Sequence, residues 1–188
     1  GIEAAARVAG AALLENGRIV AEEMVNGPLT HSETLMPMVA AVLEKSGKTV
    51  QELDAIALTN GPGSFTGLRI AAATAKGLAL GAGVGLMPIG TLEALAYNVS
   101  EWPGLAVTVM DARRNQLYAA VYQNGECIRQ PEALPPVELA AFLRKTGEKC
   151  LFLGDASDLY ADFFRAELGD CFRLAQPAHK DLRAGVLA

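Results

Sequence analysis

The chain has few of the residues on which metal and disulfide chemistry depend. Its 188 residues include two histidines, His31 and His179, and three widely spaced cysteines with no CxxC pair. Zinc sites need closely spaced His and Cys ligands, and disulfide frameworks need paired cysteines. We therefore expect no metal cofactor, and thiols that stay reduced as in a cytoplasmic protein.

Basic clusters and long apolar runs are also missing. The 16 Lys and Arg residues are outnumbered by 21 Asp and Glu, which gives a net charge of −5. A protein that binds nucleic acid alone usually presents a basic face, so a role near RNA would need a more basic partner. No segment resembles a membrane span or a secretory signal, which predicts a cytoplasmic location and no membrane contact.

An internal duplication organises the chain. An offset of 108 residues places Glu3 on Asp111 and Asn16-Gly17 on Asn124-Gly125, with Ala-Ala pairs between them in both copies. Asn-Gly between alternating strands indicates a two-residue hairpin. Each half is therefore predicted to open with a meander of three strands, with an acid at the end of the first strand.

After each meander the periodicity changes to helices and single buried strands. The first half predicts helices at 32–46, 65–80 and 91–98, and strands at 55–59 and 84–89. The second half predicts helices at 137–146 and 159–168, a strand at 150–154, a short strand near Phe172 and a last helical piece. Two α/β halves of the βββαβαβα type with mixed sheets describe the actin-like ATPase (ribonuclease H-like) architecture. Pro103-Gly104 marks the expected boundary, between an amino-terminal half at 1–103 and a carboxy-terminal half at 104–188 that we expect to be truncated.

A glycine loop joins the strand at 55–59 to the next helix. Its special residues are Gly61, Pro62, Gly63, Ser64, Thr66, Gly67 and Arg69. It is not a Walker A motif, a dinucleotide fingerprint or a nucleophile elbow, because the required Gly, Lys and Ser positions do not match. Ser64 is predicted to cap the helix, and backbone anion binding remains an alternative. Arg69 lies near the positive end of the helix dipole, which suggests an anionic partner.

The residues at the two meander tips differ in how well they could bind a phosphate group. Glu3-Ala4-Ala5-Ala6 offers no hydroxyl, and a glutamate near phosphate requires a metal. Asp111 and Arg113 at the second tip suit a residual anion site, and an ordinary surface hairpin explains them equally well. Hydrolysis is therefore not expected, and nucleotide binding is left open.

The first two helices carry more apolar surface than one sheet can cover. Thr30 and Glu33 predict a capping box before the first of them. Helices that are apolar nearly all round are buried on both sides, either in a large core or against a partner. The residues predicted to face a partner are Leu35, Met36, Val39, Leu43, Leu68, Ala72, Ala75 and Ala79.

Several segments resemble the bacterial TsaB (YeaZ) family closely. They are residues 29–37 (LTHSETLMP), the whole of 61–69 (GPGSFTGLR), 73–78 (ATAKGL), 91–96 (TLEALA) and 111–114 (DARR). The similarity runs from the first hairpin to about Tyr122, and beyond that only the architecture supports it. The glycine motif is the most specific of these segments.

The resemblance implies the actin-like ATPase fold and a non-catalytic role. It implies a dimerisation and scaffold subunit that supports the catalytic paralogue TsaD, together with TsaE, in forming N6-threonylcarbamoyladenosine on tRNA. The first-half helices would contact TsaD, or a second copy of the chain when TsaD is absent. It also implies that the chain meets tRNA only through the complex, and that any ATP binds mainly on the partners.

Two features of the chain depart from the family pattern. Members usually carry Asp and hydroxyl residues where this chain has Glu3 and alanines, and they tend to extend beyond Ala188. The family has also been labelled a glycoprotease, but this sequence offers no nucleophile or metal site for that activity. The alternative function is a small actin-like ATPase or kinase acting on its own.

Overall fold

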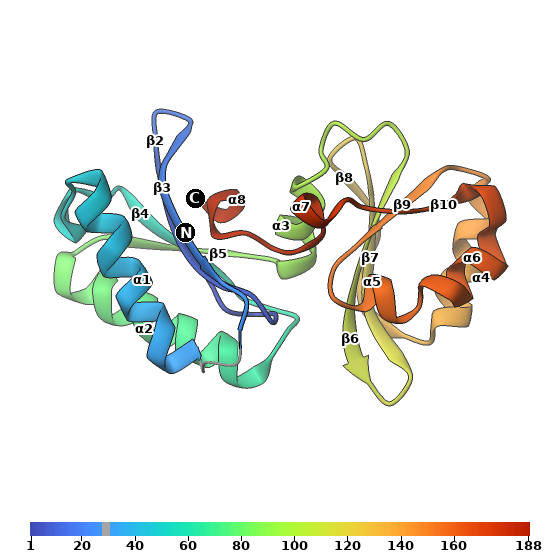
Figure 1. Ribbon diagram of the computed structural model, residues 1–188, viewed down its shortest axis with the longest axis horizontal. Coiled ribbons are helices and arrows are strands. Elements are labelled where there is room, and N and C mark those ends of the chain that lie inside the picture. The colour runs from blue at the N-terminus through green and yellow to red at the C-terminus, as the bar shows by residue number, and fades with distance from the viewer. Residues whose placement is uncertain (28–30) are drawn as a thin grey trace. The chain divides into compact units, whose positions relative to one another are not determined.

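Two five-stranded mixed sheets organise the chain (Figure 1). The computed structural model describes residues 1–27 and 31–188, so the predicted capping box of Thr30 lies partly outside the described residues. The chain divides into two compact units, Gly1–Ala94 with Leu182–Ala188 and Leu95–Asp181. No helix in the described part of the chain is both long and apolar enough to cross a membrane.

Unit 1 is built on the sheet β3-β2-β1-β4-β5. Its strands are β1 (Ile2–Glu3), β2 (Ala9–Glu15), β3 (Arg18–Val25), β4 (Ala55–Thr59) and β5 (Gly85–Ile89). Its helices are α1 (His31–Ser46), the 3-10 turn η1 (Val50–Glu52), α2 (Phe65–Ala82), most of α3 (Thr91–Tyr97), and α8 (Ala184–Leu187). The central strand β1 runs antiparallel to β2 and parallel to β4.

The helices of unit 1 cover both faces of this sheet. α1 and α2 lie side by side, and their buried side chains pack with Ala9, Ala11 and Leu13 of β2 (Figure 1). Gly10 faces the other way, because a Cβ there would meet the Ala184 side chain at 3.3 Å. α8 therefore packs on the face of β2 opposite α1.

Unit 2 repeats the same strand order with β8-β7-β6-β9-β10. Its strands are β6 (Leu105–Arg113), β7 (Gln116–Gln123), β8 (Glu126–Leu134), β9 (Cys150–Leu153) and β10 (Phe172–Leu174). Its helices are α4 (Pro136–Thr146), α5 (Ala156–Leu159), α6 (Ala161–Leu168), the 3-10 turn η2 (Gly169–Cys171) and α7 (Pro177–Lys180). The core is aromatic, with the ring centroids of Phe152 and Phe164 4.5 Å apart.

The predicted duplication is confirmed at the level of topology, with one correction in register. Both Asn-Gly turns form, with positive φ at Asn16 and Asn124. In the ladders, however, Glu3 pairs with Gly10 while Met110 pairs with Tyr118. Because β2 and β7 correspond through their hairpins, Met110 and not Asp111 is the structural counterpart of Glu3. Aligning Glu3 with Asp111, because both are acids, placed the first strands of the two halves one residue out of register.

Two other expectations differ from the structure. The helix predicted at 159–168 is present as α6 but begins two residues later, at Ala161, because Tyr160 leaves helical geometry (φ −109°, ψ 14°), and the short helix α5 before it was not predicted. The units divide after Ala94 and not at Pro103, and the last seven residues return to unit 1. There Glu22 forms an ion pair with Arg183 and accepts a hydrogen bond from the Gly185 N–H at 2.9 Å.

Candidate functional site: the glycine loop and the α1–α2 surface

The glycine loop packs directly against the connection between β1 and β2. The Ser64 N–H donates to the Ala5 carbonyl at 2.7 Å. A Cβ at Gly63 would approach the same carbonyl oxygen to 2.5 Å, and a Cβ at Gly67 would overlap the carbonyl oxygen of Ala4. Both glycines are therefore required by backbone packing between two segments that are distant in sequence.

Ser64 caps α2 as predicted. Its Oγ accepts a hydrogen bond from the Gly67 N–H at 3.2 Å, and its own N–H is taken by Ala5. Two of the loop's backbone donors are thus used inside the protein. The geometry favours a structural role for the loop over the anion-binding alternative.

Glu3 is a fully buried carboxylate where β1 meets the glycine-loop region. The Ala5 N–H donates to Oε1 at 2.5 Å, and the Thr59 hydroxyl donates to Oε2 at 2.8 Å from the end of β4. The Ala6 N–H donates to the same carboxylate. Burial raises the pKa of Glu3 to about 7, and these donated hydrogen bonds offset only part of the effect.

His31 and Arg69 flank this region with local partners. The Nε2 atom of His31 lies 3.0 Å from the Ala6 carbonyl, which ties the start of α1 to the β1–β2 connection. The Arg69 guanidinium lies 5.1 Å from the centroid of the Phe65 ring, one turn earlier in α2. The structure therefore gives Arg69 an aromatic neighbour, where the sequence suggested an anion.

The predicted partner-facing residues separate into two groups. Leu35, Val39, Ala75 and Ala79 are buried within unit 1, at 1%, 8%, 0% and 6% exposure, so their assignment to a partner interface is corrected. These four residues lie on the faces of α1 and α2 that pack against β2 and β4 of the sheet.

The other predicted residues keep solvent-accessible surface. Met36 is 46% exposed, and Leu43, Leu68 and Ala72 are half-buried. Ala40 is exposed and Phe65 is 73% exposed beside them on the same two helices. We call Met36, Ala40, Leu43, Phe65, Leu68 and Ala72 the α1–α2 surface. For this set the partner-interface assignment stays a prediction.

The second tip forms a turn stabilised by its own aspartate. The Asp111 carboxylate accepts a hydrogen bond from the Arg113 N–H at 2.8 Å, and the Asp111 N–H donates to Asp155 at 3.1 Å. Burial raises the pKa of Asp155, as do the nearby charges of Asp111 and Asp181. Three acids gathered at this tip disfavour an anion, so the surface-hairpin interpretation is the better supported one.

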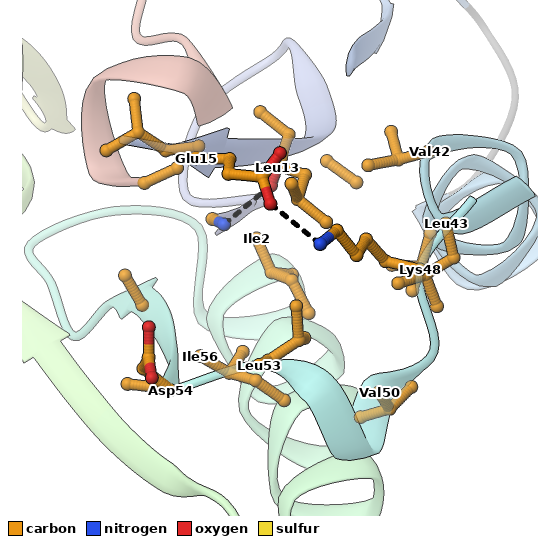
Figure 2. Close-up of a pocket in the computed structure, with 18 of the residues that line it drawn as sticks. Ile2, Leu13, Glu15, Val42, Leu43, Lys48, Val50, Leu53, Asp54 and Ile56 are labelled. Atoms are coloured by element: carbon orange, nitrogen blue, oxygen red, sulfur yellow. Dashed lines mark hydrogen bonds and ion pairs between the residues drawn. The ribbon is translucent and has the colours of Figure 1, made fainter. Parts of the chain in front are cut away.

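A separate cavity of about 490 Å³ lies at the amino end of β1, away from the glycine loop (Figure 2). Its lining is largely aliphatic, with an ion pair of 2.7 Å between Glu15 and Lys48. Over the described ranges, no three His, Cys, Asp or Glu side chains gather closely enough to hold a metal ion.

The sequence did not reveal the pairing of Glu3 with Thr59 or the contact of His31. An acid inside an otherwise apolar strand, beside a parallel strand ending in Thr, was the signal available for the first. Nothing in the spacing of His31 and Ala6 indicates that they meet.

Comparisons with known proteins relate the chain to proteins of tRNA threonylcarbamoyladenosine biosynthesis. Residues 28–168 match the family model described as TsaD, tRNA N6-adenosine threonylcarbamoyltransferase. A Bacillus subtilis protein named tRNA threonylcarbamoyladenosine biosynthesis protein TsaB is 34% identical over 184 residues, covering 95% of this chain and 80% of that protein.

Solved structures support the same assignment and the fold. A Pseudomonas aeruginosa protein described as similar to peptidase YeaZ aligns with a TM-score of 0.77 at 26% identity, covering 99% of this chain and 86% of that one. A ROK hexokinase from Thermus thermophilus aligns with a TM-score of 0.57 at 12% identity, covering 100% of this chain and 96% of that one. The hexokinase likeness concerns the fold alone, which is of the actin-like ATPase type.

Proposed function

Because the chain belongs to the TsaB (YeaZ) family, we propose that it is a non-catalytic dimerisation and scaffold subunit in the synthesis of tRNA N6-threonylcarbamoyladenosine. In this proposal it binds and supports the catalytic paralogue TsaD in the cytoplasm, with TsaE joining the complex. The chain contacts tRNA only through that complex, and any ATP is held mainly by the partners. When TsaD is absent, the same surface can pair two copies of the chain.

The observation that carries the proposal is the α1–α2 surface. Met36 and Phe65 are large apolar side chains at 46% and 73% exposure on two adjacent helices. Exposed apolar side chains grouped on neighbouring elements mark interaction sites more often than singly scattered ones do. The methionine and alanines also suit an adaptable, closely approaching helix contact.

The surroundings of the glycine loop support a non-catalytic role. The β1–β2 connection, where actin-like ATPases bind phosphate, is alanine-rich here and packs against Gly63 and Gly67. Ser64 is engaged as a helix cap, which gives no support to a peptidase nucleophile. Glu3, the acid of the first strand, is fully buried and held by internal donors.

The test is to mix the chain with TsaD of the same organism and measure the mass by light scattering after gel filtration. We expect a one-to-one heterodimer. Met36→Glu and Leu68→Glu should each weaken TsaD binding by roughly 10- to 100-fold, because each places a charge in an apolar contact. Val137→Glu, at a residue of 58% exposure on α4, is the matched control and should bind as the parent does.

Two separate, unchanged species in this mixture would refute the scaffold proposal. Binding that is unaffected by both α1–α2 variants would instead refute the interface assignment. The alternative, a small actin-like ATPase or kinase, predicts heat and turnover when Mg-ATP is titrated into the isolated chain. We expect neither in calorimetry.

A further inference from the structure

One exposed side of α2 carries a stripe of apolar and cationic residues in alternation. Phe65 and Leu80 at its ends are 73% and 88% exposed, and no large apolar side chain in the described part of the chain is more exposed. Arg69 and Lys76 between them are exposed, and Ala72 at the centre is half-buried. Steps of three and four residues place all five on one side of the helix. We call these five residues the α2 stripe, which shares Phe65 and Ala72 with the α1–α2 surface.

The charges of α2 are all positive, although the whole chain has a net charge of −5. The 18 residues of this helix include Arg69 and Lys76 and no Asp or Glu. Neither cation forms an ion pair with a residue that the structure describes, whereas Lys45 on α1 is ion-paired with Glu23. The Arg69 guanidinium lies over the Phe65 ring, and a guanidinium stacked by its face keeps N–H donors for a carboxylate. The α2 stripe therefore offers two cations that the chain itself does not neutralise.

The spacing of the two cations fits a single helix on the partner. Arg69 and Lys76 are seven residues apart, so they lie about 10 Å apart along the axis of α2. A partner helix that packs nearly parallel or antiparallel to α2 repeats this distance in its own sequence. Two carboxylates about seven residues apart on that helix would each meet one cation. Ala72 allows the two helices to approach closely between them.

The same charges disfavour the pairing of α2 with α2 of a second copy. A two-fold axis at the small residues Ala72 and Ala73 would place α2 antiparallel to its copy, with Arg69 facing Lys76. Like charges that face each other oppose association. An acidic helix of a different protein has no such conflict, so charge complementarity favours a different protein over a second copy.

We propose that the α2 stripe selects TsaD over a second copy by binding a helix of TsaD that carries two carboxylates about seven residues apart. Arg69 and Lys76 are the residues that determine this specificity, and Phe65 and Leu80 supply apolar contact at the two ends. The inference rests on the proposed function, because it takes TsaD as the partner. It adds the chemistry that the partner must present.

The first test compares two charge-neutralised variants of the full chain. Arg69→Gln/Lys76→Gln removes the charges of the stripe, and Arg18→Gln/Lys145→Gln, at exposed residues of β3 and α4, is the control with the same net charge. We expect the stripe variant to bind TsaD roughly 10- to 100-fold more weakly than the parent, and the control to bind as the parent does. Between about 50 and 500 mM NaCl, the affinity of the parent should fall about tenfold and that of the stripe variant less than about twofold.

Self-association separates charge selection from a general loss of the surface. Sedimentation should show that Arg69→Gln/Lys76→Gln dimerises at least as strongly as the parent, because the like charges have been removed. Its midpoint of urea unfolding should match that of the parent, since both side chains are exposed. A variant that loses self-association together with TsaD binding would overturn the selection, because the two cations would then only support the surface.

Carbodiimide cross-linking of the complex with TsaD locates the two carboxylates. The reagent joins the Nζ amine of Lys76 to a contacting carboxylate through an amide bond and takes up the water that is lost. Arg69→Lys supplies a second amine at the other cation. Peptide mass spectrometry should place the two linked acids about six to eight residues apart in one segment of TsaD. Linked acids on separate segments would overturn the single-helix assignment.

The outcomes distinguish this inference from the proposed function. A complex of TsaD with the parent whose affinity depends neither on salt nor on Arg69 and Lys76 would overturn the inference and leave the scaffold proposal intact. The absence of any complex between TsaD and the parent would refute the proposed function, and the inference with it.

Discussion

Replacing Glu3 with Gln should remove a pH dependence from the stability of the protein. Burial raises the pKa of Glu3 from 4.5 to about 7, so the folded state binds this proton more tightly than the unfolded chain does. The stabilisation is fully present below pH 4.5 and is lost as the pH rises through about 7. In Glu3→Gln, the amide can accept from Ala5 and donate to Thr59 at every pH.

The magnitude follows from the two pKa values. The gap between 4.5 and about 7 corresponds to roughly 3 kcal/mol in the free energy of unfolding. The side chain is 0% exposed, so solvent screening does not reduce this figure. The Glu3→Gln protein should therefore match the parent near pH 4.5 and exceed its stability near pH 8 by up to about 3 kcal/mol.

Urea unfolding at several pH values between 4.5 and 8 measures the effect. The informative quantity is the difference between variant and parent at each pH, because other titrating groups contribute equally to both. Glu126→Gln, at an exposed carboxylate, is the control and should show a constant difference. A pH-independent difference in stability between Glu3→Gln and the parent would refute the claim that burial raises the pKa of Glu3.

Further changes follow from the same contacts. Thr59→Val removes the hydroxyl that donates to Glu3 and should cost about 1.5–3 kcal/mol at pH 8, and less at pH 5, by urea unfolding. Gly67→Ala should lower the free energy of unfolding by at least about 1–3 kcal/mol, because the added Cβ would overlap the backbone carbonyl of Ala4. Gly77→Ala in the same helix is the matched control: its Cβ would meet no atom within 4 Å, so it should raise the free energy of unfolding by about 0.5–1 kcal/mol. Phe164→Ala in the unit 2 core should cost about 3–5 kcal/mol by thermal unfolding, and a loss below about 1 kcal/mol would contradict tight packing there.

Much of the fold was predictable because its periodicities are local. The strand at Ala55–Thr59 matches β4, and the helix ends near Ser46 and Thr146 match α1 and α4. Capping by Ser64 and both Asn-Gly turns were also predictable, since each depends on residues a few positions apart.

What the sequence could not supply was pairing between distant segments. The contact of Glu3 with Thr59 and the one-residue register difference between β1 and β6 both depend on ladder alignment. The face of α2 was misassigned for a related reason. Alanines surround this helix, so its pattern does not reveal that Ala75 and Ala79 pack inside while Ala72 keeps some exposure.

The return of the last residues to unit 1 has a consequence for the order in which the units can form during synthesis. Unit 2 is one continuous segment, Leu95–Asp181, and all of its strands are available once that segment has been made. Unit 1 begins first, yet its helix α8 and the ion pair of Arg183 with Glu22 can form only after the whole of unit 2 has been made. During synthesis, the face of β1–β3 that α8 covers therefore stays exposed until unit 2 has been made. Unit 2 has all of its core residues available before that face of unit 1 is covered.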